Sequence, residues 1–346
     1  MKNTLKKLTA VFTAIALAAS CAACSSPAAS SAASAAGSAS AAASAAKNFK
    51  IGVIQFATHP SLANCYNGFK AGLEEAGFKD GSNITIDFQN AQADTSNSDL
   101  IAKNMVSKKY DLIMGIATPS AMSAYSAAKS TDIPVVFTAV SDPLAAGIVK
   151  AKEKPGVNCT GSSDVLPLEQ QIKMIRAFLP NAKKIGIIYT TSEPNSVSQL
   201  KQFKELAPKY NFEVVDVGVT SSSEVAAASA TAVSKGVDCI NNFTDNNVVD
   251  NLSTVLQAAD GAKIPVFGSE EEQVKNGCLA SQSIDYVALG KETGKMAAKI
   301  LKGEAKAADI PVYEVKECTP VYNKAVMDKL GLTLPAEYSK ATAVTK

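Results

Sequence analysis

The sequence predicts an α/β protein of two Rossmann-like lobes, each built on a parallel sheet, joined by a multi-strand hinge and facing each other across a cleft. Three observations support this fold class. Apolar strand-length runs alternate with helical patterns, this order is written twice along the chain, and polar residues follow the strands. A repeat of more than a hundred residues indicates a duplicated domain and not a solenoid.

The duplication is clearest in two strand–helix–strand segments. Residues 111–143 contain a short apolar run, a helix-forming stretch and a second apolar run at 133–140, and residues 237–268 follow the same order. Matching positions of the two copies are separated by similar numbers of residues. The separation is 134 from Ile51 to Ile185, 127 from Asp111 to Asp238, and 131 from Pro134 to Pro265. Loop insertions would produce such small differences.

The remaining elements extend both copies. In lobe one, apolar residues at 66, 69, 73 and 76 form a helical stripe, followed by a strand at 84–88 and a helix at 95–110. Lobe two has a strand at 213–217 and a helix at 222–235, and a helix at 286–303 and a strand at 310–315 follow. We expect lobe one over 48–163, with 286–310 returning to it, and lobe two over 164–285, with 311–346 finishing on it.

The first 24 residues have the pattern of an export signal. Lysines at 2, 6 and 7 precede an apolar stretch at 8–19 that is too short to span a bilayer. Small residues before a cysteine are typical of the bacterial lipobox, so we favour Cys24 as the lipidated residue, with Cys21 as the alternative. A plain secretory signal is the other interpretation. Residues 25–47 are almost only alanine and serine, which predicts a flexible tether.

The composition argues against several kinds of chemistry. Basic and acidic residues number 34 and 32 with no basic run, which disfavours nucleic-acid binding. Five of the seven cysteines lie in the body, scattered and odd in number, so we interpret them as core residues. The single histidine, His59, has no triad or metal-ligand companions, and a P-loop and a nucleophile elbow are missing. We therefore expect no catalytic residue, no metal and no cofactor.

Polar side chains follow the predicted strands at their carboxyl ends, the edge where open parallel sheets bind ligands. Strand-end Thr and Ser before a helix suit a carboxylate and acidic residues suit an ammonium, so an α-amino acid would satisfy both. The candidate ligand-binding residues are Gln55, Ser61, Thr118, Ser120, Thr138, Asp142, Glu193, Asn195, Ser196, Asp245, Asn246 and Asp285.

Purely structural roles compete with ligand binding at several of these positions. Ser120 and Ser196 could be helix N-caps, and Asp142 could belong only to a turn. The acidic run at 270–272 is interpreted as a solvated loop, and Tyr125 as a packing residue.

Read in order, the motifs of the body resemble one family. They are Gln55…His59-Pro-Ser-Leu62, Ala117-Thr-Pro-Ser-Ala121, Ile133-Pro-Val-Val-Phe137, Val140-Ser-Asp-Pro143…Ala146-Gly147, Pro155-Gly-Val-Asn158, Thr160-Gly-Ser-Ser-Asp164, Glu193-Pro-Asn-Ser196, Asp245-Asn246 and Asp285-Tyr-Val-Ala-Leu-Gly290. Across 48–335 the chain is similar to the TrpX/YtpR-like ABC transporter substrate-binding lipoproteins, which have the type I periplasmic-binding-protein fold.

The resemblance implies a receptor for an aromatic amino acid, tryptophan especially, and gives roles to the candidate residues. Thr118, Ser120 and Thr138 would bind the carboxylate. Asp142, Asp245 and Asp285 would bind the ammonium, and Glu193, Asn195 and Ser196 would close from lobe two. At one position the chain departs from the pattern, because Ala63 stands where relatives often carry an acid.

We therefore expect a monomeric, non-enzymatic receptor, exported and lipid-anchored to the outer face of the bacterial cytoplasmic membrane. It would close on tryptophan, tyrosine or phenylalanine and deliver it to an ABC permease with a cytoplasmic ATPase. Alternatives are a branched-chain amino acid, a nucleoside or a sugar as ligand, or a sensing role in a signalling system. The chain has no Trp, on which sugar sites usually stack their ligands. A repressor of this fold would need a helix-turn-helix where the export signal stands.

Overall fold

The computed structural model describes residues 48–345, which belong to one compact unit. The predicted export signal, the tether and the candidate lipidation sites Cys21 and Cys24 lie outside the described residues. Among the helices of the described part, none is both long and apolar enough to cross a membrane.

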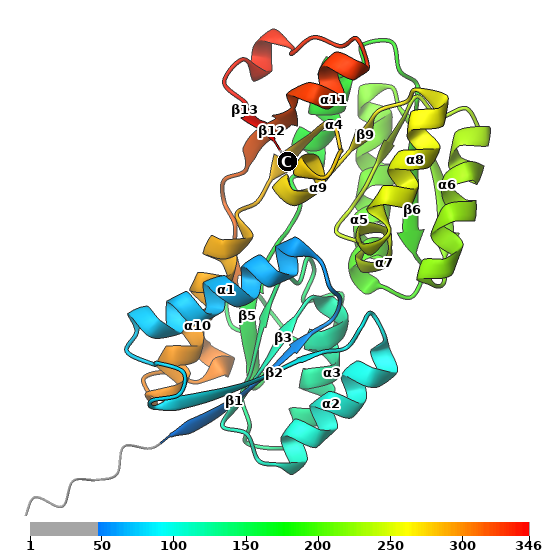
Figure 1. Cartoon of the computed structure of the whole chain (residues 1–346). Coiled ribbons are helices and arrows are strands. Elements are labelled where there is room, and N and C mark those ends of the chain that lie inside the picture. The colour runs from blue at the N-terminus through cyan, green and yellow to red at the C-terminus, as the bar shows by residue number, and fades with distance from the viewer. Residues whose placement is uncertain (1–47, 346) are drawn as a thin grey trace, which may run out of the picture. The chain divides into compact units, whose positions relative to one another are not determined.

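Lobe one is built on a six-stranded sheet with the order β11-β5-β4-β3-β1-β2, in which every neighbouring pair is parallel (Figure 1). The strands are β1 (Phe49–Gln55), β2 (Ile84–Asn90), β3 (Leu112–Ile116), β4 (Val135–Thr138), β5 (Cys159–Ser163) and β11 (Tyr313–Glu314). The helices are α1 (Pro60–Glu75), α2 (Thr95–Ser107), α3 (Thr118–Ala128) and α10 (Tyr286–Leu301), with the 3₁₀ turn η3 (Ala307–Asp309).

Successive residues of a strand in this sheet pack into different apolar clusters. Val53 belongs to the cluster that contains Phe69 of α1 and Leu289 of α10. Ile54, the next residue of β1, belongs to the cluster that contains Met105 of α2. Because helices cover both faces, the strands are near-continuous apolar runs, as is usual for parallel sheets.

Helices α1 and α10 lie side by side although they are far apart in the sequence (Figure 1). Their close approach requires glycine on both helices. A Cβ atom added to Gly72 would stand 2.2 Å from the carbonyl oxygen of Lys291, and one added to Gly290 would stand 2.0 Å from that of Cys65. This contact holds α10 on lobe one.

Lobe two contains two sheets. Strands β7 (Glu213–Val219), β6 (Lys184–Thr190), β8 (Cys239–Asn241) and β9 (Val266–Phe267) form a parallel sheet in that order. Strands β10 (Ala280–Ser283), β12 (Thr319–Asn323) and β13 (Thr342–Val344) form the other, where β10 and β12 are antiparallel. The helices are α4 (Leu168–Phe178), α5 (Pro194–Leu206), α6 (Val225–Ser234), α7 (Asn246–Asp250), α8 (Leu252–Ala262), α9 (Glu271–Lys275) and α11 (Lys324–Lys329). The 3₁₀ turns are η1 (Ala207–Tyr210), η2 (Ser222–Glu224) and η4 (Ala336–Tyr338).

The predicted α/β architecture with parallel sheets is confirmed, with local differences. Of the expected strand at 310–315, only Tyr313–Glu314 forms a strand, β11. Because β11 pairs with β5, the part of the chain that returns to lobe one extends past the predicted boundary at 310. The expected helix at 222–235 begins with η2, because the Glu224 carboxylate accepts hydrogen bonds from the backbone and hydroxyl of Thr220 and caps the turn locally. The five described cysteines are free, and all but Cys318 are buried, which confirms their interpretation as core residues.

Candidate functional site

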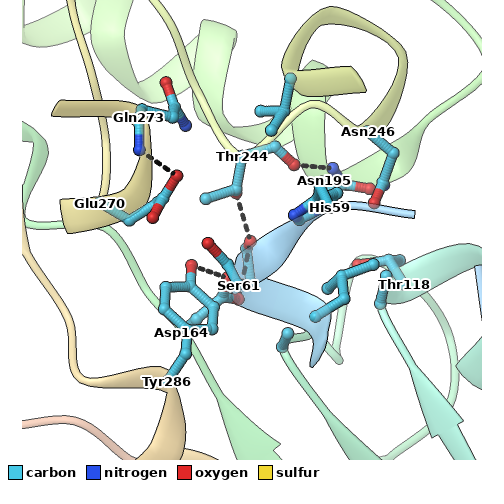
Figure 2. Close-up of a pocket in the computed structure, with 15 residues that line it drawn as sticks. His59, Ser61, Thr118, Asp164, Asn195, Thr244, Asn246, Glu270, Gln273 and Tyr286 are labelled. Carbon is cyan, nitrogen blue, oxygen red and sulfur yellow. Dashed lines mark hydrogen bonds between the residues drawn. The ribbon is translucent and has the colours of Figure 1, made fainter. Parts of the chain in front are cut away.

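A cavity lies where the carboxyl ends of strands from both lobes meet (Figure 2). The lining residues are His59, Ser61, Leu62, Ala117, Thr118, Ala139, Ser141, Asp164, Asn195, Thr244, Asn246, Val249, Glu270, Gln273 and Tyr286.

Lobe one contributes the beginnings of α1 and α3. Each helix starts with a proline at its first or second position, which suits the helix N-terminus because proline has no N–H to satisfy. The hydroxyls of Ser61 and Thr118 lie in these first turns, are buried, and have no hydrogen-bond partner among the described residues. Two alanines of the wall, Ala117 and Ala139, have positive φ angles of 75° and 54°. Such strained backbone is commonest at ligand sites.

Lobe two contributes polar side chains held by the turn after β8. The Asn195 amide donates from Nδ2 to the backbone oxygen of Thr244, 3.1 Å away, and to Glu193 Oε2 at the same distance. Asn246 Nδ2 donates to the same Glu193 oxygen at 2.7 Å. Burial, and then the charge of Asp245 nearby, raise the pKa of Glu193. Glu193 therefore lies behind the cavity wall and orients two amides that form it.

The two acidic residues of the cavity come from different segments. Asp164 directly follows β5 and accepts hydrogen bonds from Ser141 Oγ at 3.0 Å and from Tyr286 Oη at 2.8 Å. Burial raises its pKa to about 6, although these hydroxyls partly offset the shift. Glu270 precedes α9 and caps it by accepting from the backbone N–H of Gln273 at 2.9 Å. Burial raises the pKa of Glu270 to about 7.

His59 is the N-cap residue of α1, and its ring faces the cavity. Burial lowers its pKa to about 4, so the imidazole is neutral at pH 7. Over residues 48–345, no group of three or more His, Cys, Asp and Glu side chains is placed to hold a metal ion.

The cavity has two chemically different ends (Figure 2). The acidic end consists of Ser61, Asp164, Glu270, Gln273 and Tyr286. Three of these residues, Ser61, Glu270 and Tyr286, also line a neighbouring cavity. The amide end consists of His59, Thr118, Asn195 and Asn246, the last two joined through Glu193.

Four of the predicted ligand-binding residues line this cavity: Ser61, Thr118, Asn195 and Asn246. The others that follow strands are buried behind it and bond to neighbouring protein groups. They are Gln55 (to Ala57), Ser120 (to Ser98), Thr138 (to Ser162), Glu193 (to Asn195 and Asn246), Ser196 (to Asp245) and Asp245 (to Thr190). Their predicted ligand contacts would require a different arrangement of the side chains.

Asp142 and Asp285 do not line the cavity. Asp142 Oδ1 accepts from the backbone N–H of Ala145 at 2.9 Å, and its Oδ2 accepts from Ser198 Oγ at 2.9 Å. Asp285 is the N-cap of α10 and accepts from the backbone N–H groups of Val287 and Ala288. Both carboxylates therefore have structural partners in this conformation.

Seven lining residues with polar side chains or rings were not among the predicted ligand-binding residues: His59, Ser141, Asp164, Thr244, Glu270, Gln273 and Tyr286. The interpretation of 270–272 as a solvated loop is wrong for Glu270, which is 3% exposed because it caps α9 inside the protein. The signal for Asp164 was its place directly after β5, and Thr244 lies three residues after the end of β8. Gln273 and Tyr286 gave no such signal, since they lie within or at the start of helices.

Hydrogen bonds join the two lobes beside the cavity. Gln199 Nε2 of α5 donates to Ser141 Oγ at 2.9 Å and to Thr244 Oγ1 at 2.8 Å. Ser198 donates to Asp142. Ser141, Asp142, Ser198 and Gln199 are called the clasp below. The clasp reaches the cavity through Ser141, which bonds to Asp164.

Comparison with known proteins gives consistent matches. The family model of ABC transporter substrate binding proteins matches residues 50–346. A tyrosine-binding protein from Clostridioides difficile (strain R20291) is 44% identical over 286 residues, which cover 83% of this chain and 82% of that protein. The structure of an ABC domain from Streptococcus pneumonia in complex with L-Trp is similar with a TM-score of 0.83 at 40% identity, covering 87% of this chain and 100% of that one.

A third relative differs in conformation. The ligand-free, open structure of a substrate-binding protein with adhesive properties from Clostridium difficile has 43% identity but a TM-score of only 0.65, over 86% of this chain and 99% of that one. The sequence identity of this chain to the L-Trp complex, 40%, is nearly equal to its identity to the open structure, 43%. The difference in TM-score therefore reflects conformation more than sequence divergence. The present structure resembles the L-Trp complex more than the open protein, in agreement with the hydrogen bonds of the clasp.

Proposed function

Because the chain belongs to the family of ABC transporter substrate-binding proteins, we propose that it captures an aromatic amino acid in the cavity between its lobes. The observation that carries the proposal is the cavity itself, which combines an acidic end, unpartnered hydroxyls and apolar walls. The similarity to a tyrosine-binding protein and to an L-Trp complex supports the same class of ligand.

The acidic end suits the amino and carboxyl groups of the ligand. Asp164 and Glu270 would attract the ammonium, and no lysine or arginine is among the described residues that line the cavity. Ser61 Oγ and the N-terminus of α1 would bind the carboxylate, since helix N-termini favour anions. Asp142 and Asp285 remain predicted ammonium ligands, but they do not line the cavity, whereas Asp164 does, which favours Asp164.

The ligand's ring would extend toward the amide end between Leu62, Ala117 and Val249. Burying about 150–250 Å² of aromatic side chain contributes roughly 4–6 kcal/mol. Micromolar affinity requires about 8 kcal/mol net of association costs. Apolar burial is therefore insufficient alone, and the polar groups at both ends must contribute.

Closure of the lobes follows from this arrangement. A ligand that contacts Ser61 of lobe one and Glu270 of lobe two together binds the closed state better than the open state, so it shifts the population toward closure. The closed protein would then deliver the ligand to an ABC permease with a cytoplasmic ATPase. We further propose that it acts outside the cytoplasm as a monomer, without enzymatic activity, anchored through a lipid on Cys24 or Cys21.

A thermal-shift screen of purified protein against the twenty amino acids, nucleosides and simple sugars tests the proposal. Ligand at a hundred times its Kd adds about 2.7 kcal/mol, which corresponds to roughly 5 °C for a protein of this size. We expect a shift with tyrosine, tryptophan or phenylalanine. A shift confined to a branched-chain amino acid, a nucleoside or a sugar would refute the aromatic ligand while keeping the receptor. A cooperative melt that no compound shifts would favour a sensing or partner-binding role.

A further inference from the structure

Two buried amides of lobe two, Asn195 and Gln273, line the cavity. Asn195 and Gln273 are 3% and 1% exposed, and Asn195 Oδ1 and Gln273 Oε1 have no hydrogen-bond partner among the described residues. Their nitrogens are already used: Asn195 Nδ2 donates to the backbone oxygen of Thr244, and Gln273 Nε2 donates to that of Phe243 at 3.3 Å.

These backbone bonds decide which way the two amides face. A carbonyl oxygen only accepts hydrogen bonds, so turning either amide over would set oxygen against oxygen. Phe243 and Thr244 are consecutive residues, and Figure 2 shows Gln273 and Asn195 on opposite sides of Thr244. The turn after β8 therefore fixes the orientation of one amide at each end of the cavity.

Buried acceptors without a donor are unfavourable by about 1–3 kcal/mol each, so a ligand that fills the cavity should bring donors to both. The backbone N–H of Gln273 donates to Glu270, so this residue lies at the acidic end, where the ammonium of the proposed amino acid would supply N–H groups. The Asn195 oxygen lies at the amide end, which the ring would reach. There the nearest donor of the ligand is a group on the ring itself.

We propose that Asn195 determines specificity by accepting a hydrogen bond from the ring of the ligand, so that the cavity selects an aromatic amino acid with a phenolic O–H or an indole N–H over phenylalanine. Gln273 accepts from the ammonium and does not discriminate among rings. This inference rests on the proposed function and deepens it. A site built to bond a ligand hydroxyl rejects the analogue that lacks it, because its own polar group is then left unpaired.

Calorimetric titration of the protein with L-tyrosine, L-tryptophan, L-phenylalanine and O-methyl-L-tyrosine tests the proposal. We expect tyrosine or tryptophan to bind at least about tenfold more tightly than phenylalanine. O-methyl-tyrosine, which keeps the oxygen but not the donor, should lose affinity as phenylalanine does. This comparison needs no variant and separates a donor requirement from a preference for size.

Variants then identify the residue. Asn195→Ala should bring the affinities for tyrosine and phenylalanine to within about threefold, mainly by weakening tyrosine, whereas Gln273→Ala should weaken both equally. Asn247→Ala is the matched control, because Asn247 is a buried amide of the same lobe that bonds to Thr190 and does not line the cavity. Its ratio of tyrosine to phenylalanine affinity should equal that of the wild type.

The outcomes separate this inference from the proposed function. If the wild type binds none of the aromatic amino acids, the proposed function fails. If it binds phenylalanine or O-methyl-tyrosine as tightly as tyrosine and tryptophan, the function stands and the inference is overturned. Equal loss of all ligands in Asn195→Ala would likewise overturn it, since a structural role would weaken every ligand alike.

Discussion

Replacing Asp164 with asparagine tests how the cavity holds an amino acid. Asp164 is 2% exposed, and its carboxylate accepts hydrogen bonds from Ser141 and Tyr286. Asparagine has nearly the same shape, so the core should tolerate it. However, the amide carries no charge for the ligand ammonium, and it loses one of the two acceptors that the hydroxyls need.

The magnitude follows from removing one partner of a buried, hydrogen-bonded charge pair, which weakens binding by about 2–5 kcal/mol. At about 1.4 kcal/mol for each factor of ten, Asp164→Asn should raise the Kd about 30-fold to about 4000-fold. Asp142→Asn should have a much smaller effect, on the order of 1 kcal/mol or less, because Asp142 bonds to Ser198 at a partly exposed position.

Calorimetric titration with the preferred amino acid between pH 5 and pH 8 is the assay. The pKa of Asp164 is raised to about 6, so wild-type affinity should fall as the pH drops through 6 and the carboxylate takes up a proton. Asp164→Asn should lack that part of the pH dependence. Affinity that falls with Asp142→Asn but not with Asp164→Asn would refute this assignment and restore the sequence-based one.

Three further changes should have measurable effects. Gly72→Ala should destabilise the protein by about 1–3 kcal/mol, because the added methyl group collides with α10. The Tm should fall by several degrees, and an unchanged Tm would contradict the close contact. The stability of ligand-free protein should depend on pH through Glu270 and His59. Stability due to neutral Glu270 is lost as the pH rises through about 7, and stability due to neutral His59 is lost as it falls from 6.5 to about 4. Glu270→Gln should flatten the alkaline side of the Tm–pH curve, and an unaltered curve would contradict this. Gln199→Ala should weaken binding roughly 5- to 30-fold through faster dissociation, whereas Lys201→Ala, at an exposed position of the same helix, should not. Equal dissociation rates of the two variants in stopped-flow measurements would argue against the clasp.

The sequence predicted the fold class correctly because its evidence is local. Apolar runs such as Leu112–Ile116 and helix-starting prolines such as Pro60 specify elements whatever the rest of the chain does. The edge where the cavity lies also followed from sequence, since parallel strands carry their carboxyl ends to one side. Ser61, Thr118, Asn195 and Asn246 lie on the cavity for that reason.

The tertiary structure alone decided which polar groups face the cavity and which face the protein. Strand-end position is shared by Asp164, which lines the cavity, and Asp245, which caps α7 and bonds to Thr190. Sequence does not separate them, because the choice depends on partners that arrive from other segments. The same is true of Gln273, whose amide is oriented by the bond from its nitrogen to the Phe243 carbonyl, thirty residues earlier in the chain. Local pattern therefore determines the elements and the edge, whereas contacts between distant segments determine the chemistry of the site.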